Sequence, residues 1–590
     1  MNYQNLFRAM GITILAIGLN QSPALAGDQV TVTVGSDGSC DYTTITAAVF
    51  NAPAANRLEI RLAKNVSINT TQLVNVRDTL LRGGFDTCSD NTPSGNSTLD
   101  GNGFNGSILL GANSGEAVVD LWIENVEITG GNTNTRGGGV SLTGSWRLAM
   151  AGTNINNNVA NGNGGGIYME NLSARSERGF PGAPRSSLEI YDNSIISSNT
   201  GEDGGGIACA GDVGIEVFDS QIGQNEARSD GGGVFLTDGC LFELNDSGPF
   251  QGVLLNEAAG FGGGIYAVEN SEVRLRGGDN GGFPAVVAAN SATNGAGIAL
   301  RSSSVLDARD SLISGNTAAN TGGGIRSDDS EVHLYRSRPG TQCHNAQRCS
   351  VVRDNVANGT DGGFAGGGGI LAVGGTIRIT GTYFEENRAN FGSAIRARFI
   401  PLDVASREIT ILGSVFAENS GAPQVVYLDE SDADLGFNTF VDNVDNVRMI
   451  EIAYPDTPLG PHETRIFGSI FDQAGTTVAS AELTTFGQFP TADCNRNEAS
   501  SAGDLVGGPR STTAPPNFAD RGAGDYSLAR LASPMIDFCD SSILGSLSNF
   551  SANGLDRPND LPAGDLYGPW DLGGIEYYDL ERIFSDRFED

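Results

Sequence analysis

A short glycine phrase that recurs along the middle of the chain constrains the fold more than any other feature. Three glycines followed by Ile or Val occur seven times, and two degenerate copies keep the same phase. The smallest gaps between successive Ile/Val positions are 25 to 27 residues, and the gaps of up to 45 indicate units with loop insertions. A fixed period of this length is typical of stacked repeat architectures. The phrases are Gly137–Val140, Gly164–Ile167, Gly204–Ile207, Gly231–Val234, Gly262–Ile265, Gly322–Ile325 and Gly367–Ile370, with degenerate copies at Gly295–Ile298 and Gly392–Ile395.

An asparagine keeps step with most of these phrases. It lies eight or nine positions before the Ile or Val. Equivalent asparagines in stacked coils can hydrogen-bond one another through their side-chain amides. We therefore predict a repeat asparagine ladder, made of Asn158, Asn199, Asn225, Asn256, Asn290, Asn316 and Asn387.

Short runs between these marks alternate apolar and polar residues, as in Val119–Ile123, Val332–Leu334 and Ile377–Ile379. Such alternation indicates half-buried strands. One strand of four or five residues cannot bury an apolar face alone, whereas stacked strands about 4.8 Å apart can. The sequence therefore predicts an all-β fold, a right-handed parallel β-helix solenoid from about residue 60 to 475, with three strands and three turns per coil.

Two other repeat folds fit the sequence less well. Propeller blades run to about 40–45 residues, which is longer than the base unit here. A calcium-binding β-roll repeats a nonapeptide with an aspartate after its glycines, whereas these glycines are followed by an apolar residue.

Four segments follow from this pattern. Residues 1–26 are interpreted as a secretory signal, because Arg8 precedes a short apolar stretch and Ala24–Ala26 supply small residues for cleavage. Residues 27–130 are expected to hold an N-terminal cap and the first coils, and 131–475 the glycine-phrase β-helix. Residues 476–590 form an irregular C-terminal segment with a short tail. No stretch is apolar over the ~20 residues of a transmembrane helix, so none is expected.

The charge balance restricts the partners. Acidic residues outnumber basic ones 70 to 35, which gives a formal charge of −35. A polyanion is not expected to bind nucleic acid through its phosphates or to dock on an anionic membrane. Carbohydrate or a surface protein are the expected partners, and the oligomeric state is left open.

Export permits disulfide bonds. Sequence proximity pairs the eight cysteines as Cys40–Cys88, Cys209–Cys240, Cys343–Cys349 and Cys494–Cys539. Eight cysteines allow 105 connectivities, so this pairing is one hypothesis among many. A zinc site is the alternative, although no Cys-x-x-Cys occurs and His344 stands alone beside Cys343.

The repeat region, over about 130–445, resembles the passengers of polymorphic outer-membrane proteins. Their GGAI phrase is similar to Gly392–Ile395, and their FxxN motif is similar to Phe384–Asn387, Phe416–Asn419 and Phe440–Asn443. Cys40–Val49 resembles the N-terminal cap of pectin-lyase-like proteins, a strand that leads into a short helix. The C-terminal segment resembles secreted choice-of-anchor Q proteins in Ser533–Asp537, Gly554–Pro558 and Asp571–Glu576. These resemblances imply an address in the envelope or outside the cell, with Glu581–Asp590 as a sorting tag, a last strand or a frayed end.

Candidates for chemistry are few, and we assign no catalytic residue, metal ligand or cofactor. The adjacent carboxylates Asp328 and Asp329 precede His333, which we interpret as an outward-facing strand residue. The acidic run Asp429–Asp434 could bind Ca²⁺ through oxygen ligands, although a solvated loop is the simpler interpretation. The insertions at 171–186 (with Arg175, Arg178 and Arg185) and 336–366 are candidate binding loops.

The sequence therefore favours an exported, non-catalytic adhesion, interaction or envelope protein, either secreted or associated with the outer membrane. The alternative is a polysaccharide lyase or glycoside hydrolase acting on acidic polysaccharide. Three or more Asp or Glu residues with an Arg, Lys or His in one groove would favour this alternative.

Overall fold

The computed structural model describes residues 28–573 except for a set of short segments. These are 68, 75–76, 116, 172–185, 246–247, 249–250, 278–282, 337–349, 362, 364, 399–407, 432, 445–447, 454–463, 473–481, 485–490, 498–509, 530–532, 537 and 540–570. The expected signal 1–26, the Cys343–Cys349 pair, the Arg175–Arg185 loop and the Glu581–Asp590 tail all lie outside the described residues.

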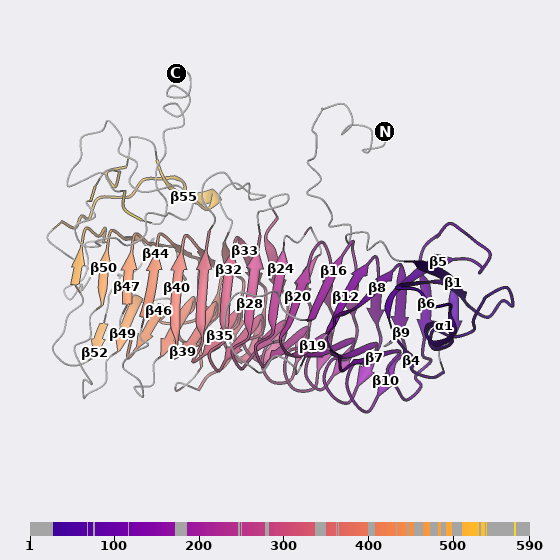
Figure 1. Cartoon of the computed structure of the whole chain (residues 1–590). Coiled ribbons are helices and arrows are strands. Elements are labelled where there is room, and N and C mark those ends of the chain that lie inside the picture. The colour runs from indigo at the N-terminus through magenta and orange to yellow at the C-terminus, as the bar shows by residue number, and fades with distance from the viewer. Residues whose placement is uncertain are drawn as a thin grey trace, which may run out of the picture.

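The described chain winds into a long stack of parallel strands, which confirms the right-handed parallel β-helix (Figure 1). A representative coil runs through β11 (Val140–Gly144), β12 (Trp146–Ala151), β13 (Asn154–Asn156) and β14 (Val159–Ala160) before β15 (Ile167–Asn171) starts the next. Corresponding strands of successive coils pair in register, as Val140 does with Ile167. We name the resulting sheets C, A, B and D, in the order in which the coil visits them.

The coil has a fourth side that the sequence did not predict. In the described residues, sheets A, B and C hold 16, 14 and 14 strands, and sheet D holds nine strands, most of them only two residues long. Sheet D lies between the asparagine and the glycine phrase, where a turn was expected. Two residues there suffice to bond the next coil, as Thr133 does with Ala160.

The stack also extends beyond the predicted limits of about 60 and 475. It begins at β1 (Gln29–Val34), which pairs with β2 (Arg57–Ala63). It ends at β53 (Thr491–Asp493), which pairs with β50 (Arg465–Phe467). These end coils lack the glycine phrase, which is why the repeat did not reveal them.

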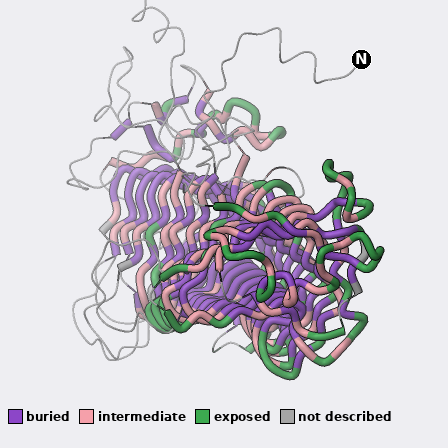
Figure 2. Tube along the Cα trace, turned by 45° about the vertical axis from the view of Figure 1, so that its right-hand side comes forward, coloured by how far each residue is buried: buried purple, intermediate pink, exposed green. Residues whose placement is uncertain are grey.

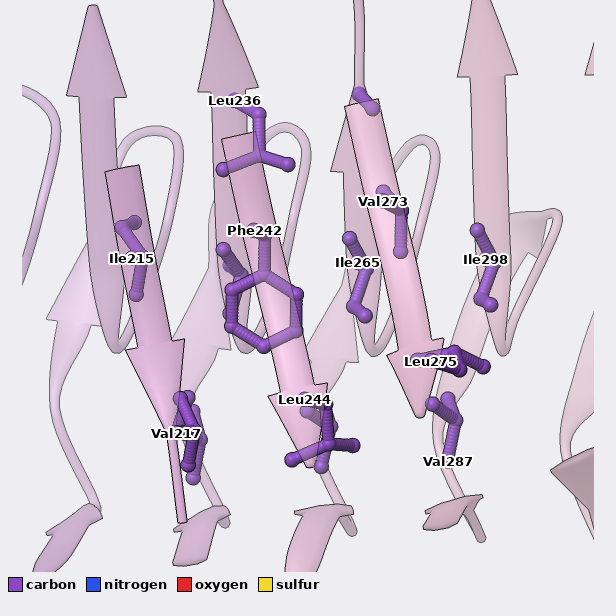
Figure 3. Close-up of a cluster of buried hydrophobic side chains, with 14 of the residues drawn as sticks. Ile215, Val217, Leu236, Phe242, Leu244, Ile265, Val273, Leu275, Val287 and Ile298 are labelled. Carbon is purple, nitrogen blue, oxygen red and sulfur yellow. The ribbon is translucent and has the colours of Figure 1, made fainter. Parts of the chain in front are cut away.

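Apolar side chains from sheets A, B and C fill the interior. Figure 2 shows buried residues running through the stacked strands and exposed residues gathered at turns. In the close-up of Figure 3, Ile215, Phe242 and Leu275 of sheet A lie with Ile265 of sheet C and Val287 of sheet B in one cluster. Towards the C-terminal end, rings of Phe384, Phe416, Phe440 and Phe471 stack with centroid distances of 4.6 to 5.1 Å. These phenylalanines therefore contact the phenylalanine at the equivalent position of the neighbouring coil.

A short helix closes the N-terminal end. Helix α1 (Ile45–Asn51) starts after Thr44, whose hydroxyl accepts a hydrogen bond from the amide of Ala47. Its buried residues Ile45 and Val49 join the core cluster of the coils. The helix shields apolar surface at the first coils, as the sequence predicted.

The C-terminal segment folds back along the side of the last coils. Its hairpin β54 (Phe518–Asp520) and β55 (Asp525–Leu528) places Tyr526 against outward-facing Val351 and Val415 of sheet B. Further on, Met535, Phe538 and Leu572 form a second cluster beside Phe437 and Phe467.

Polar contacts hold the same segment. Arg521 donates to Asp442 at 2.9 Å and to Asp472 at 2.6 Å, and the hydroxyl of Tyr526 donates to Glu418 at 3.2 Å. The described parts of the C-terminal motifs, Ser533–Ile536 and Asp571–Gly573, therefore lie against the last coils. Gly554–Pro558 and the ends of the other two motifs lie outside the described residues.

Three of the four predicted cysteine pairs lie within the described residues, and each forms a disulfide. The Cα–Cα distances are 5.1 Å for Cys40–Cys88, 6.5 Å for Cys209–Cys240 and 6.0 Å for Cys494–Cys539. The first joins the cap to the early coils, the second lies inside the coil stack, and the third ties the C-terminal segment to the last coil.

Candidate functional site

The predicted asparagines form one continuous hydrogen-bonded line inside the turn between sheets B and D. Each Nδ2 donates to the Oδ1 of the asparagine one coil on, at 2.9 to 3.1 Å, and to a backbone carbonyl of the previous coil. All of these side chains are buried. The line is therefore part of the scaffold and is not accessible to a ligand.

The line also contains Asn355, Asn419 and Asn443. The sequence pattern did not identify Asn355, because a loop lengthens its coil. Asn355 therefore lies 15 positions before Ile370 instead of eight or nine. Asn419 and Asn443 end two of the FxxN motifs, and no glycine phrase follows them. The FxxN motif was the signal that marked these positions.

The structure separates Asp328, Asp329 and His333. Asp328 ends β35 (Ile325–Asp328) on sheet C and accepts hydrogen bonds from Arg326 at 3.1 Å. Asp329 lies in the turn that follows, with a φ of 47°. His333 lies on β36 (Glu331–Tyr335) of sheet A, half-buried, with its Nε2 3.5 Å from Glu331. The aspartates and the histidine thus belong to different faces of the coil.

The acidic run Asp429–Asp434 is divided in the same way. Asp429 ends β46 (Gln424–Asp429) on sheet C, where Arg398 lies 3.2 Å away. Asp434 lies on β47 (Ala433–Gly436) of sheet A and bonds to Arg465. Asp432 lies outside the described residues. Asp429 and Asp434 thus each pair with an arginine, on different sheets, and Glu430 lies in the turn between them with a φ of 54°.

A row of glutamates lies on the outer face of sheet A and was not predicted from the sequence. Glu189 of β16 (Ser186–Tyr191), Glu216 of β20 (Val213–Val217) and Glu243 of β24 (Leu241–Asn245) occupy one register position in adjacent strands. Their spacing of 27 residues equals the base repeat, and this was the signal available in the sequence. Adjacent strands place these carboxylates about 4.8 Å apart at their base.

The row continues in the same register with two arginines, an aspartate and a histidine. Arg274 of β28 (Glu272–Arg276), Asp307 of β32 (Val305–Arg309), His333 and Arg378 of β40 (Thr376–Thr380) follow Glu243 in order. The face therefore gathers several carboxylates beside arginine and histidine.

Several of these groups are joined in ion pairs within the sheet. Arg274 bonds to Glu272 at 2.6 and 3.0 Å and lies 3.6 Å from Glu243. Arg276 bonds to Asp307 at 2.6 Å. Half of the row is thus internally neutralised, while the stretch Glu189–Glu243 concentrates negative charge.

Glu216 occupies the centre of this negative stretch. Loss of hydration beside its neighbours raises the pKa of its carboxyl, and the charges of Glu243 and Glu189 raise it further. Glycosidases use a pair of neighbouring carboxyl groups in which the pKa of one, the acid catalyst, is raised by its surroundings.

A second acidic column lies in the turns that precede the asparagine ladder. Asp354, Glu386 and Glu418 occupy equivalent left-handed positions with φ of 54°, 55° and 57°. A hydrogen bond with Asp354 raises the pKa of Glu386 to about 6, with smaller contributions from burial and the neighbouring charges.

This pKa shift predicts that the stability of the fold depends on pH, and that substituting Glu386 removes this dependence. Because the folded-state pKa lies above the ordinary value of 4.5, the proton bound by Glu386 stabilises the fold below pH 4.5, and this stabilisation is lost as the pH rises through 6. Glu386→Gln mimics the protonated form. We expect it to raise the unfolding temperature by about 1 °C at pH 7, a small effect for an exposed group, and to leave it unchanged at pH 4.5.

Thermal unfolding followed by circular dichroism between pH 4.5 and 7 measures this difference. Glu269→Gln is the matched control, since Glu269 also lies in a left-handed turn, with a φ of 57°. A gain for Glu386→Gln that is equal at both pH values, or an equal gain for the control, would contradict the prediction.

The comparisons with known proteins add no relative. No family model matches the chain, and neither a curated protein nor a solved structure is significantly similar to it. Within the described ranges, no helix is both long and apolar enough to span a membrane. A potential metal-ligating group in the same residues, Asp37 with Cys40 and Cys88, contains a disulfide.

Proposed function

We propose that the protein is an exported, non-catalytic β-helix that binds an extended polymer along its lateral faces, at the cell surface or after secretion. The observation that supports this most directly is the in-register row on sheet A, where ionisable side chains repeat once in every strand over the seven strands from β16 to β40. A regular row on a rigid sheet matches a ligand that is itself repetitive.

Two further features support this role. The disulfides Cys40–Cys88 and Cys494–Cys539 reinforce both ends of the stack and are consistent with an oxidising location. Ion pairs such as Arg276–Asp307 hold the outer face of sheet A in a fixed arrangement, which favours display of a surface over movement during a reaction.

Binding without turnover tests the proposal. The chain from Gly27 onwards is applied to a glycan array, and the same samples are assayed for new reducing ends and for unsaturated uronates. We expect retention on at least one polysaccharide and no change in the polymer. Clear turnover, or absence of binding to every surface polymer, would overturn the proposal.

The glutamate row supports a second candidate function, glycoside hydrolysis. Retaining glycosidases hold two carboxyl groups about 5–5.5 Å apart, with one of them protonated before reaction. Glu216 and Glu243 are register partners in adjacent strands, so their backbone positions are about 4.8 Å apart, and the pKa of Glu216 is shifted upward, as that of an acid catalyst is.

A single variant distinguishes this candidate. If any polysaccharide is hydrolysed, Glu216→Gln is expected to lower the rate at least 100-fold, because general acid catalysis contributes about 10²–10⁴-fold. Glu272→Gln, on the same face but paired with Arg274, is the control. Equal rates for Glu216→Gln and the unsubstituted protein would exclude this site.

A further inference from the structure

Sheet C carries the same combination of side chains twice on its outer face. In each copy, an aromatic residue directly precedes a glycine phrase, a buried or half-buried arginine lies against its ring, and a second arginine pairs with an aspartate one strand on. The copies involve β31 (Ile298–Arg301) with β35, and β43 (Ile395–Arg398) with β46. The same combination of side chains therefore occurs twice on this face, although the loops between the strands are irregular.

The first copy is centred on Phe261. The guanidinium carbons of Arg301 and Arg326 lie 5.0 and 5.1 Å from the centre of its ring, and Tyr266 stacks on it at 5.8 Å. Arg301 also lies 3.6 Å from Asp328, which occupies the same register position in the next strand. Phe261 is half-buried and the side chain of Arg301 is 45% exposed, so both can be reached by solvent.

The second copy is centred on Arg396. Its guanidinium carbon lies 5.2 Å from the ring centre of Phe391 and 5.3 Å from that of Tyr427. Arg398 lies 3.2 Å from Asp429, again the register partner in the next strand. Phe391 and Tyr427 are both half-buried.

The two copies are aligned along the stack. Arg301, Asp328, Val373, Arg398 and Asp429 occupy one register column, so Arg301 and Arg398 are three strands apart. At about 4.8 Å for each strand, their backbone positions are about 14 Å apart. A third, simpler combination lies nearer the N-terminus, where Arg136 donates to the hydroxyl of Tyr168 at 2.6 Å with its guanidinium over the ring.

Bracing of the glycine turns explains only part of this arrangement. Arg326 bonds to Asn294 at 2.9 Å and to Thr321 at 2.7 Å, and Arg396 donates to backbone carbonyls of the preceding turn. These two arginines therefore stabilise the turns. Arg301 and Arg398 lie two residues further from the turns than these arginines. Arg301 lies beside the half-buried ring of Phe261, and Arg398 combines its pair with Asp429 with a hydrogen bond to the carbonyl of Gly363 at 2.6 Å.

The charges on this face indicate the class of ligand. The four arginines of the two copies are accompanied by Asp328 and Asp429, and Asp230 and Asp361 act electrostatically on Arg301 and Arg396. The local charge is therefore balanced, on a chain whose formal charge is −35. An anionic polymer gains little at a balanced face and is repelled by the rest of the surface. A neutral molecule with many hydroxyl groups avoids this repulsion.

We propose that the outer face of sheet C between β31 and β46 binds a neutral saccharide chain. Sugar C–H groups contact the exposed parts of the half-buried Phe261 and Tyr427 side chains, and sugar hydroxyls bond to Arg301 and Arg398 and their partner aspartates. The two copies engage separate residues of one chain, which raises the overall affinity through effective concentration. This site adds sheet C to the lateral faces of the proposed function and names the class of polymer bound there, so it rests on that function.

Calorimetric titration tests the site with defined probes. Neutral pentasaccharides of glucose, mannose and xylose are compared with pentagalacturonate. We expect at least one neutral probe to bind, and Arg301→Gln and Arg398→Gln each to weaken its binding about tenfold, because a hydrogen bond to a charged group contributes about 1.5 kcal/mol or more. Preferential binding of pentagalacturonate, or of no neutral probe, would overturn the proposal.

Arg353→Gln is the matched control, since the side chain of Arg353 is also 45% exposed and lies 3.7 Å from Asp354, but on sheet B. An equal loss of affinity in this control would also overturn the proposal. Failure here differs from failure of the proposed function. Binding that persists in Arg301→Gln and Arg398→Gln places the ligand elsewhere, whereas cleavage of the probe shows an enzyme.

Discussion

Replacing Asn316 with alanine is expected to destabilise the coil stack by about 3–5 kcal/mol. Asn316 is completely buried and makes four hydrogen bonds with its side chain. Its Nδ2 donates to Asn355 at 2.9 Å and to the carbonyl of Val287 at 3.1 Å. Its Oδ1 accepts from both the side chain and the backbone amide of Asn290, each at 3.0 Å.

The size of this destabilisation follows from the hydrogen-bonding groups that lose their partner when Asn316 is replaced. Each buried polar group without a partner costs about 1–3 kcal/mol, and alanine leaves two donors of Asn290 and the carbonyl of Val287 unsatisfied. The effect should also be local, because each coil contacts only its neighbours. Amide hydrogen exchange of the full chain should show loss of protection concentrated near residues 287–355.

The control for this variant is Asn161→Ala. Asn161 is exposed and donates to Asn134 at 2.8 Å, so the substitution removes an amide pair of the same chemistry outside the core. We expect a change within about 0.5 kcal/mol. Comparable destabilisation by the two variants, measured by urea unfolding, would show that the buried ladder contributes no more than a surface bond.

Replacing Gly262 with valine is expected to destabilise the protein by about 3 kcal/mol or more. Gly262 is the first glycine of its phrase and has a φ of 65°, a region that branched side chains rarely adopt. A Cβ placed there would lie 2.4 Å from the carbonyl oxygen of Ile265 and 2.7 Å from the Cβ of Tyr266. The backbone cannot move away easily, because Gly262 donates to Asn294 in the next coil at 3.0 Å.

Gly103→Ala separates the two causes of this effect. Gly103 has a φ of 72°, but a Cβ at this position meets no atom within 4 Å. Only the conformational cost of about 1–2 kcal/mol applies there. Urea unfolding that gives equal losses for Gly262→Val and Gly103→Ala would show that close packing of the glycine turns does not matter.

The same geometry explains the pattern of the nine phrases. The first glycine is present in all of them, with φ between 53° and 73°, whereas Ala296 replaces the second glycine, and Ser393 and Ala394 replace the second and third. The sequence showed this invariance. The structure shows its cause, which is backbone conformation at the first position.

Several features were predictable because they depend on residues close together in the chain. The alternation of Ile377–Ile379 placed a strand, the glycine phrase placed a turn, and the asparagine eight or nine positions earlier placed the polar line. The helix at Ile45–Asn51 was predicted from its resemblance to a known cap, and three cysteine pairs were predicted from proximity in the chain.

The sequence by itself determined the unit and its stacking, because a rung this short can bury its apolar side and satisfy its backbone only by pairing with a copy of itself. Only the tertiary structure decided which side chains share a column, since loops of different length between rungs obscure the register. Stacking of the coils brings together residues that are far apart in the chain, as it does for Glu189, Glu216 and Glu243 and for Arg301 and Arg398. Tyr526 and Met535 likewise pack against earlier coils, and the apolar surface that they contact exists only after the stack has formed.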